Sequence, residues 1–122
     1  EITLPDQMEI SAEFQPKEAI NLLPESIKVE LYRIIQELIT NTIKHARATT
    51  IELQLLKYED FINLIVEDNG IGFNKHKKGK GMGVNNVISR VKLMNGDIDI
   101  DSEDNRGTMI NIDIPLDKNQ NQ

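Results

Sequence analysis

The sequence predicts an α+β fold in which helices cover one face of a mostly antiparallel β-sheet. Two patterns lead to this prediction. Two segments carry apolar residues at intervals of three and four, as amphipathic helices do, and five segments show the alternating or apolar-rich pattern of strands. Four of these five segments form two pairs joined by short polar turns, which indicates antiparallel hairpins.

The first half of the chain is predicted to form a strand, a long helix and a hairpin. Residues 8–14 alternate apolar and polar side chains and predict a half-buried strand. The helix extends from about residue 24 to residue 45, because apolar residues recur there at the helical period: Ile27, Leu31, Ile34, Ile35, Leu38, Ile39 and Ile43. Residues 49–58 and 61–68 are two β-type runs around an acidic turn, and they predict the first hairpin.

The second half is predicted to form a loop, a shorter helix and a second hairpin. Residues 69–83 are rich in glycine and lysine and almost free of apolar residues, which predicts a mobile loop. A helix is predicted over residues 83–94, and Gly96 is expected to stop it. Residues 97–102 and 107–116 alternate strictly on either side of the turn "EDNRG" and predict the second hairpin.

Composition restricts the class of protein. The 122 residues suit a single domain, and the absence of cysteine excludes disulfides and thiolate metal sites. A formal charge of −6 and a pI of about 4.9 argue against duplex nucleic acid as the main partner. No apolar run approaches the length of a membrane span, and no signal segment opens the chain. Because it begins with Glu1 rather than methionine, we expect a piece of a longer protein.

The long predicted helix carries a polar stripe beside its apolar face. Glu37, Asn41 and Lys44 fall within about 60° of one another around the helix axis. A carboxylate and an amide oxygen suit Mg²⁺, and a nearby ammonium suits a phosphate. A solvated helix face explains the same residues, and the helix alone favours that simpler interpretation. His45, next along the chain, is more typical of a residue that complements the helix dipole than of a ligand.

The stretch "VEDNGIGF" follows a strand that should be buried. An ionised Asp68 there needs hydrogen-bond donors, and an exocyclic amine of adenine would supply one, whereas the carbonyl of guanine would not. Gly70 and Gly72 would let the backbone approach a flat ligand closely. An Asx turn is the alternative, because "DNG" is a common turn sequence.

The stretch "KGKGMGVNNV" leads into the second predicted helix. Its glycines, Gly79, Gly81 and Gly83, leave backbone N–H groups and the positive end of the helix open toward an anion, and the nearby lysines add charge. A P-loop is excluded because GxxxxGK[ST] does not occur, and the glycine spacing fails the GxGxxG motif. The pattern therefore predicts a polyphosphate site of another kind.

These motifs occur in a specific order: "ELITNTIKHA", "EDNGIGF", "GKGMGV" and the "GT" of "RGTMINIDIPL". In this order they resemble the ATP-binding domain shared by sensor histidine kinases, the chaperone Hsp90, DNA gyrase and MutL. The resemblance covers nearly the whole chain. The "KHA" ending and "GMGVNNVISRV" are similar to the kinases of two-component systems whose response regulators carry helix-turn-helix outputs. The resemblance implies a two-layer α/β sandwich of the Bergerat (GHKL) type, with a mixed, mostly antiparallel sheet covered on one face by helices.

The resemblance also implies roles for individual residues. Asn41 would bind Mg²⁺, with Glu37 supporting the metal or a water, and Lys44 and His45 would contact phosphates. Asp68 would receive the adenine amine above Gly70 and Gly72, and Thr108 would reach the base, often through water. The second glycine box would close over the phosphates, and it comprises Lys80, Gly81, Met82, Gly83 and Val84.

The implied activity is that of a protein-histidine kinase with ATP and Mg²⁺ as cofactors. Residues 1–117 would form the catalytic domain and 118–122 a disordered tail, while the acceptor histidine lies on an upstream dimerisation domain absent from this chain. The expected partners are that domain and a response regulator, and the isolated domain is expected to be a cytoplasmic monomer without membrane contact. The sequence leaves open whether the parent protein is membrane-anchored. Three alternatives remain: a serine kinase of the anti-sigma-factor type, an ATP hydrolase with Glu37 as base, and a nucleotide-sensing module without catalysis.

Overall fold

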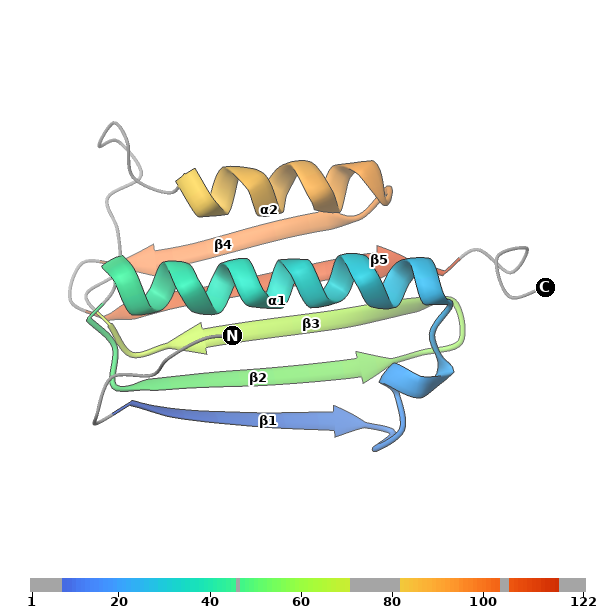
Figure 1. Ribbon diagram of the computed structural model, residues 1–122, viewed down its shortest axis with the longest axis horizontal. Coiled ribbons are helices and arrows are strands. Elements are labelled where there is room, and N and C mark those ends of the chain that lie inside the picture. The colour runs from blue at the N-terminus through green and yellow to red at the C-terminus, as the bar shows by residue number, and fades with distance from the viewer. Residues whose placement is uncertain (1–7, 46, 71–81, 104–105, 117–122) are drawn as a thin grey trace.

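A five-stranded sheet with two helices on one face makes up the computed structural model, which describes residues 8–45, 47–70, 82–103 and 106–116 (Figure 1). The helices are α1 (Glu25–His45) and α2 (Met82–Leu93), and a single 3₁₀ turn, Ile20–Leu22, precedes α1. The strands are β1 (Glu9–Gln15), β2 (Thr50–Lys57), β3 (Phe61–Asp68), β4 (Asp97–Glu103) and β5 (Gly107–Pro115). The predicted α+β class is therefore confirmed; the 3₁₀ turn was not predicted.

The strands lie in the order β1-β2-β3-β5-β4. The predicted hairpins are both present, β2 with β3 and β4 with β5, and β3 pairs antiparallel with β5 in the middle of the sheet. Only β1 and β2 run parallel, because α1 carries the chain back along the sheet between them. This arrangement is the mixed, mostly antiparallel sheet that the sequence predicts.

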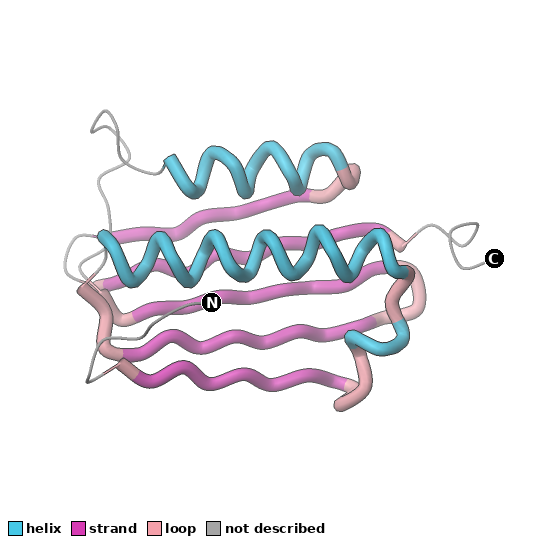
Figure 2. The backbone as a smooth tube through the Cα atoms, viewed as in Figure 1, coloured by secondary structure: helices cyan, strands magenta, loops and turns pink. Residues whose placement is uncertain are grey.

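The core lies between the sheet and the two helices, which cover the same face (Figure 2). Alternate residues of the central strands face the helices, and those on β2, β3 and β5 include Leu55, Leu64 and Ile112, each at most 1% exposed. From α1 the stripe predicted by the helical period supplies the facing layer, including Leu31, Ile34 and Leu38. Both periodicities therefore point their apolar residues into one shared core.

The end of α2 differs from the expectation that Gly96 stops it. Asn95 adopts the left-handed conformation, with φ of 59°, and the N–H groups of Asn95 and Gly96 donate to the carbonyls of Lys92 and Val91. This is a Schellman ending with asparagine in the position that glycine usually takes. Gly96 is needed for a different reason, because a Cβ there would lie 2.5 Å from the carbonyl oxygen of Asp113.

One end of the sheet collects the segments that the sequence singled out. The C-terminal end of α1, the ends of β3 and β4 and the starts of α2 and β5 all lie on the left in Figure 1. Across this end Asp68 of β3 is paired with Thr108 of β5. No helix in the described part of the chain is long and apolar enough to span a membrane.

Candidate functional site

Asp68, the last residue of β3, is buried, with 8% of its surface exposed. It belongs to the series of β3 residues that face the helices, so its carboxylate lies on the covered side of the sheet. Its Oδ1 accepts the backbone N–H of Gly70 at 2.8 Å. This bond is an Asx turn, so the turn and the buried carboxylate that the sequence offered as alternatives are present together.

Burial dominates the electrostatics of Asp68. Loss of solvent raises the pKa of its carboxyl above the usual value, while hydrogen bonds from the backbone of Gly70, the backbone of Thr108 and the side chain of Thr42 lower it in part. An ionised carboxylate in this position still has lone pairs directed away from its protein donors. The carboxylate can therefore accept a further hydrogen bond from a ligand.

Thr42 is a site residue that the sequence reasoning missed. It is buried on α1, one turn after Leu38, and its hydroxyl lies 2.9 Å from the Leu38 carbonyl oxygen. The hydroxyl has a single proton, so it can donate to this carbonyl or to Asp68 at any moment, but not to both. The sequence feature that could have identified Thr42 is its position, because this hydroxyl residue continues the apolar stripe of the helix.

Asn69 has a structural role beside the carboxylate. Its Oδ1 accepts the backbone N–H groups of Thr49 and Thr50 at 2.8 and 2.9 Å, and its Nδ2 donates to the Thr49 hydroxyl at 2.8 Å. These bonds join the end of β3 to the start of β2. In the "DNG" sequence, Asn69 therefore connects the ends of the two strands, whereas the side chain of Asp68 points toward the interior.

Gly107, at the start of β5, was also missed as an individual residue. Its φ of 93° lies in the region that favours glycine, and a Cβ there would overlap the carbonyl oxygen of Asp68. The next residue, Thr108, is 7% exposed, and its hydroxyl lies 2.9 Å from that of Ser102 on β4. Gly107 therefore allows β5 to approach the backbone of the site strand and brings Thr108 beside Asp68.

The polar stripe of α1 is divided between a partner helix and solvent. Glu37 Oε1 accepts a hydrogen bond from Nε of Arg90, on α2, at 3.1 Å. Its other oxygen, Oε2, is buried and has no hydrogen-bond partner among the described residues. Asn41, one turn further along, is partly buried, and its side-chain amide makes no hydrogen bond to another described residue. Lys44 is exposed. The structure thus leaves one carboxylate oxygen and one amide free on the same stretch of helix.

Arg90 is the third residue that the sequence reasoning did not single out. Its Nη1 also lies 3.1 Å from Oε1 of Glu30, which is seven residues before Glu37 and on the same side of α1. The hydrogen bond to Glu37, followed by that to Glu30, raises the pKa of the guanidinium, so it remains a cation. In the sequence Arg90 looks like an ordinary basic residue in the last turns of a helix.

The free oxygens fit a hard cation that keeps part of its water shell. Within the described residues no group of three or more acidic, histidine or cysteine side chains could enclose a metal. Mg²⁺ does not need such a cage, since it commonly takes one or two protein oxygens and completes its octahedron with water and phosphate oxygens. The unpartnered Oε2 of Glu37 and the amide of Asn41 are consistent with that pattern.

The predicted phosphate-binding segment can be placed only in part. Val84 is buried in the first turns of α2, and Met82 and Gly83 begin that helix. The predictions for Gly72, Lys80 and Gly81, and most of the predicted mobile loop, lie outside the described residues. His45 ends α1, and the structure does not describe its side chain.

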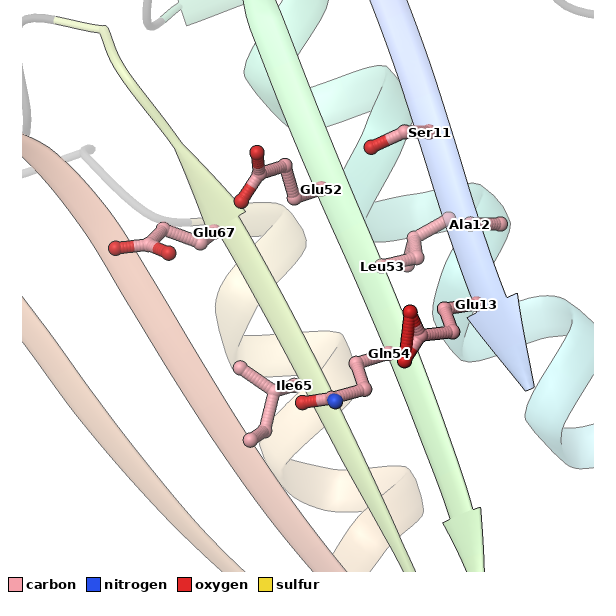
Figure 3. A pocket seen from close by; sticks show the side chains of 8 residues that line it. All are labelled: Ser11, Ala12, Glu13, Glu52, Leu53, Gln54, Ile65 and Glu67. Carbon is pink, nitrogen blue, oxygen red and sulfur yellow. The ribbon is translucent and has the colours of Figure 1, made fainter. Parts of the chain in front are cut away.

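The opposite face of the sheet is unsuited to a polyphosphate. The described strand positions that point outward on this face include no lysine or arginine. Nine of them are acidic: Glu9, Glu13, Glu52, Glu67, Asp97, Asp99, Asp101, Glu103 and Asp113. A hollow of about 360 Å³ on this face is bordered by the carboxylates of Glu13, Glu52 and Glu67 (Figure 3). Like charges would repel ATP from this hollow, which leaves the helix-covered side of Asp68 as the candidate site.

Sequence comparison relates the chain to known proteins. Residues 27–118 match the family of histidine kinase-, DNA gyrase B- and HSP90-like ATPases. The oxygen sensor histidine kinase NreB of Staphylococcus carnosus is 36% identical over 92 residues, which are 74% of this chain and 26% of that protein. The histidine-protein kinase/phosphatase DegS of Bacillus subtilis is 37% identical over 98 residues, which are 77% of this chain and 26% of that protein.

Solved structures support the same fold. The blue-light activated histidine kinase of Erythrobacter litoralis superimposes with a TM-score of 0.76 at 21% identity, over 92% of this chain and 36% of that chain. Its histidine kinase domain gives a TM-score of 0.72 at 20% identity, over 95% of this chain and 55% of that chain. The chain spans about a quarter of the length of the curated relatives. It belongs to the family of histidine kinase-, DNA gyrase B- and HSP90-like ATPase domains.

Proposed function

We propose that this chain is the catalytic ATP-binding domain of a sensor histidine kinase, which binds Mg·ATP and supplies its γ-phosphoryl group to a histidine on a separate domain. Family membership supports ATP binding, and the relatives described above are sensor histidine kinases. Within the chain, the proposal depends most on Asp68, a buried carboxylate at the end of a central strand with lone pairs left for a ligand.

Asp68 would select the base. It would accept a hydrogen bond from the exocyclic amine of adenine, with Gly70 and Gly72 under the ring and Thr108 close enough to contribute directly or through water. Guanine presents a carbonyl at the same place, so two acceptors would face each other at a cost of about 1–3 kcal/mol. The nucleotide would therefore be ATP rather than GTP.

The stripe on α1 would serve the phosphates. Glu37 Oε2 and Asn41 would hold Mg²⁺ directly or through its water, and Lys44 would lie against phosphate oxygens together with His45. When bound, the metal would offset the charge of the phosphate oxygens. The second glycine box, which comprises Lys80, Gly81, Met82, Gly83 and Val84, would close over the same groups.

The domain would position its substrate rather than form covalent bonds itself, as is general for phosphoryl transfer. The attacking imidazole would come from the dimerisation domain of the parent kinase, and a cognate response regulator would then receive the phosphoryl group. We place this activity in the cytoplasm, with the isolated domain a monomer. The chain alone should bind ATP without phosphorylating His45 or His76, and robust self-phosphorylation would contradict the proposal.

A calorimetric titration tests the proposal. The wild-type chain should bind Mg·ATP more tightly than Mg·GTP by about tenfold or more, and Asp68→Asn should lose most of that affinity and preference. Glu67→Gln is a matched control, because this neighbouring carboxylate is exposed on the opposite face and should leave binding unchanged. Equal affinity for GTP, or an unaffected Asp68→Asn variant, would remove the assigned role of Asp68.

The alternatives differ in their products. An ATP hydrolase would use Glu37 to activate water, and the domain alone would then show appreciable steady-state ATP turnover. A serine kinase would give an acid-stable product with a matching acceptor, whereas phosphohistidine is acid-labile. A purely nucleotide-sensing module would transfer nothing after an upstream helical domain is restored. These experiments separate the classes without further assumptions about the site.

A further inference from the structure

Arg90 and Glu37 form the contact that joins the two helices beside the proposed metal site. Arg90 Nε lies 3.1 Å from Glu37 Oε1, and the side chains are 30% and 25% exposed. Arg90 Nη1 reaches Glu30 at the same distance, and the second oxygen of Glu30 lies 3.4 Å from Arg33. The guanidinium of Arg90 is therefore held on both sides, and it holds Glu37 in turn.

The other oxygen of Glu37 has an unusual environment. Oε2 is buried and finds no hydrogen-bond partner in the described part of the chain, although the side chain as a whole is exposed enough to reach water by rotating. A buried unpartnered acceptor costs about 1–3 kcal/mol, so an unrestrained carboxylate would turn toward solvent. The bond to Arg90 opposes that rotation and keeps Oε2 directed inward.

We infer that Arg90 is a positioning residue that holds Glu37 by Oε1 so that Oε2 stays available to the metal ion or to its water. The inference rests on the proposed function, since it assigns Glu37 to Mg²⁺. Arg90 need not touch the nucleotide, and it acts through the carboxylate that it orients. Partners that orient metal-binding side chains in this way commonly contribute 10- to 100-fold to metal affinity.

The test measures how much Mg²⁺ improves ATP binding. The affinity of the 122-residue chain for ATP is determined by calorimetry with Mg²⁺ and with a chelator, and the ratio of the two dissociation constants is the metal enhancement. Arg90→Met should reduce this enhancement by about tenfold, toward that of Glu37→Gln. Arg90→Lys keeps the charge but loses the forked donors of the guanidinium, so it should give an intermediate enhancement. This variant replaces Arg90→Met in the test if Arg90→Met does not fold.

The double variant separates positioning from direct electrostatics. If Arg90 acts through Glu37, adding Arg90→Met to Glu37→Gln should change the enhancement no further. Glu30→Gln is the matched structural control, because it removes the charge of the other partner of Arg90 and leaves the Glu37 contact in place. It should lower the unfolding temperature, as Arg90→Met does, but keep the metal enhancement within about twofold of wild type.

Three results would overturn the inference. Arg90→Met could lower stability and leave the enhancement intact, which would make the contact purely structural. It could weaken ATP binding equally with and without metal, also in the Glu37→Gln background, which would assign Arg90 to the phosphates. A wild-type chain that does not bind ATP would remove the proposed function as well, whereas the first two results would leave that function standing.

Discussion

Gly107 lies so close to Asp68 that a β-carbon on it would overlap the Asp68 carbonyl oxygen. The same glycine has a φ of 93°, which L-residues with side chains rarely adopt. Its neighbour Thr108 is paired with Asp68 across the two strands. The backbone around Asp68 is therefore shaped in part by Gly107 of the neighbouring strand.

Gly107→Ala should damage both stability and binding. The added methyl group must displace the Asp68 backbone and adopt a strained conformation, for a loss of about 3 kcal/mol in the free energy of unfolding. Because Asp68 moves with its backbone, the folded variant should bind Mg·ATP at least about tenfold more weakly. Urea denaturation and calorimetry would measure the two effects.

Gly96→Ala provides the control at the other end of β5. A Cβ there would lie 2.5 Å from the Asp113 carbonyl oxygen, so a loss of about 2 kcal/mol is expected. Since Asp113 pairs with Asn63 rather than with the end of β3, the folded variant should bind Mg·ATP like wild type. If both variants weakened ATP binding equally, the effect of Gly107 would be one of general stability.

Asp68→Asn should stabilise the folded chain at neutral pH while it abolishes nucleotide selectivity. Burial raises the pKa of the Asp68 carboxyl in the folded state, so folding favours the protonated form and stability falls as pH rises through the folded pKa. Asparagine avoids this loss and can still accept the Gly70 N–H. The variant should therefore be more stable than wild type at pH 7.

The pH dependence of this difference is the critical measurement. As pH is lowered through the raised pKa, wild type regains stability and the advantage of Asp68→Asn should shrink toward zero. Urea denaturation of both proteins at a series of pH values would show this. Glu67→Gln controls for the loss of one negative charge, and an Asp68→Asn variant less stable than wild type at pH 7 would contradict the argument.

The fold was predictable because each element carries its own pattern. The stripe on α1 and the alternation along β3 and β5 depend on neighbours in sequence, and the burial of Leu38, Leu64 and Ile112 follows from them. The parallel pairing of β1 with β2 was not predicted, because the helix between them permits a parallel pair but does not specify which strand β1 joins. Elements that local periodicity specifies were therefore identified before the tertiary structure was known.

The candidate site was predictable only for residues that belong to recognisable motifs, such as Asp68 and Asn41. Arg90 is 53 residues from Glu37, and no local pattern specifies which side chain of α2 meets it. Gly107 matters because two strands approach there, and Asn95 shows that a left-handed ending need not use the nearby glycine. Contacts of this kind depend on how helices and strands pack together, which periodicity does not encode.

Asn69→Ala should be a stability variant rather than a binding variant. It removes three side-chain hydrogen bonds to Thr49 and Thr50, for an expected loss of about 2 kcal/mol in the free energy of unfolding. Asn69→Asp keeps the acceptor of two of these bonds and loses only the donor of the third, so it should cost less. Denaturation measures these losses, and wild-type stability in Asn69→Ala would show that the bonds contribute nothing net.

Thr42→Val should raise the pKa of the Asp68 carboxyl further. Valine matches threonine in shape but removes the hydroxyl, which is one of the three groups that lower this pKa against the effect of burial. Thr42→Ser keeps the hydroxyl and should leave the titration of Asp68 close to that of wild type. Carbon-detected NMR of the Asp68 carboxyl over a pH series would measure both variants. An unchanged titration in Thr42→Val would mean that the hydroxyl proton is committed to the Leu38 carbonyl, 2.9 Å away, and that Asp68 depends on its backbone donors alone.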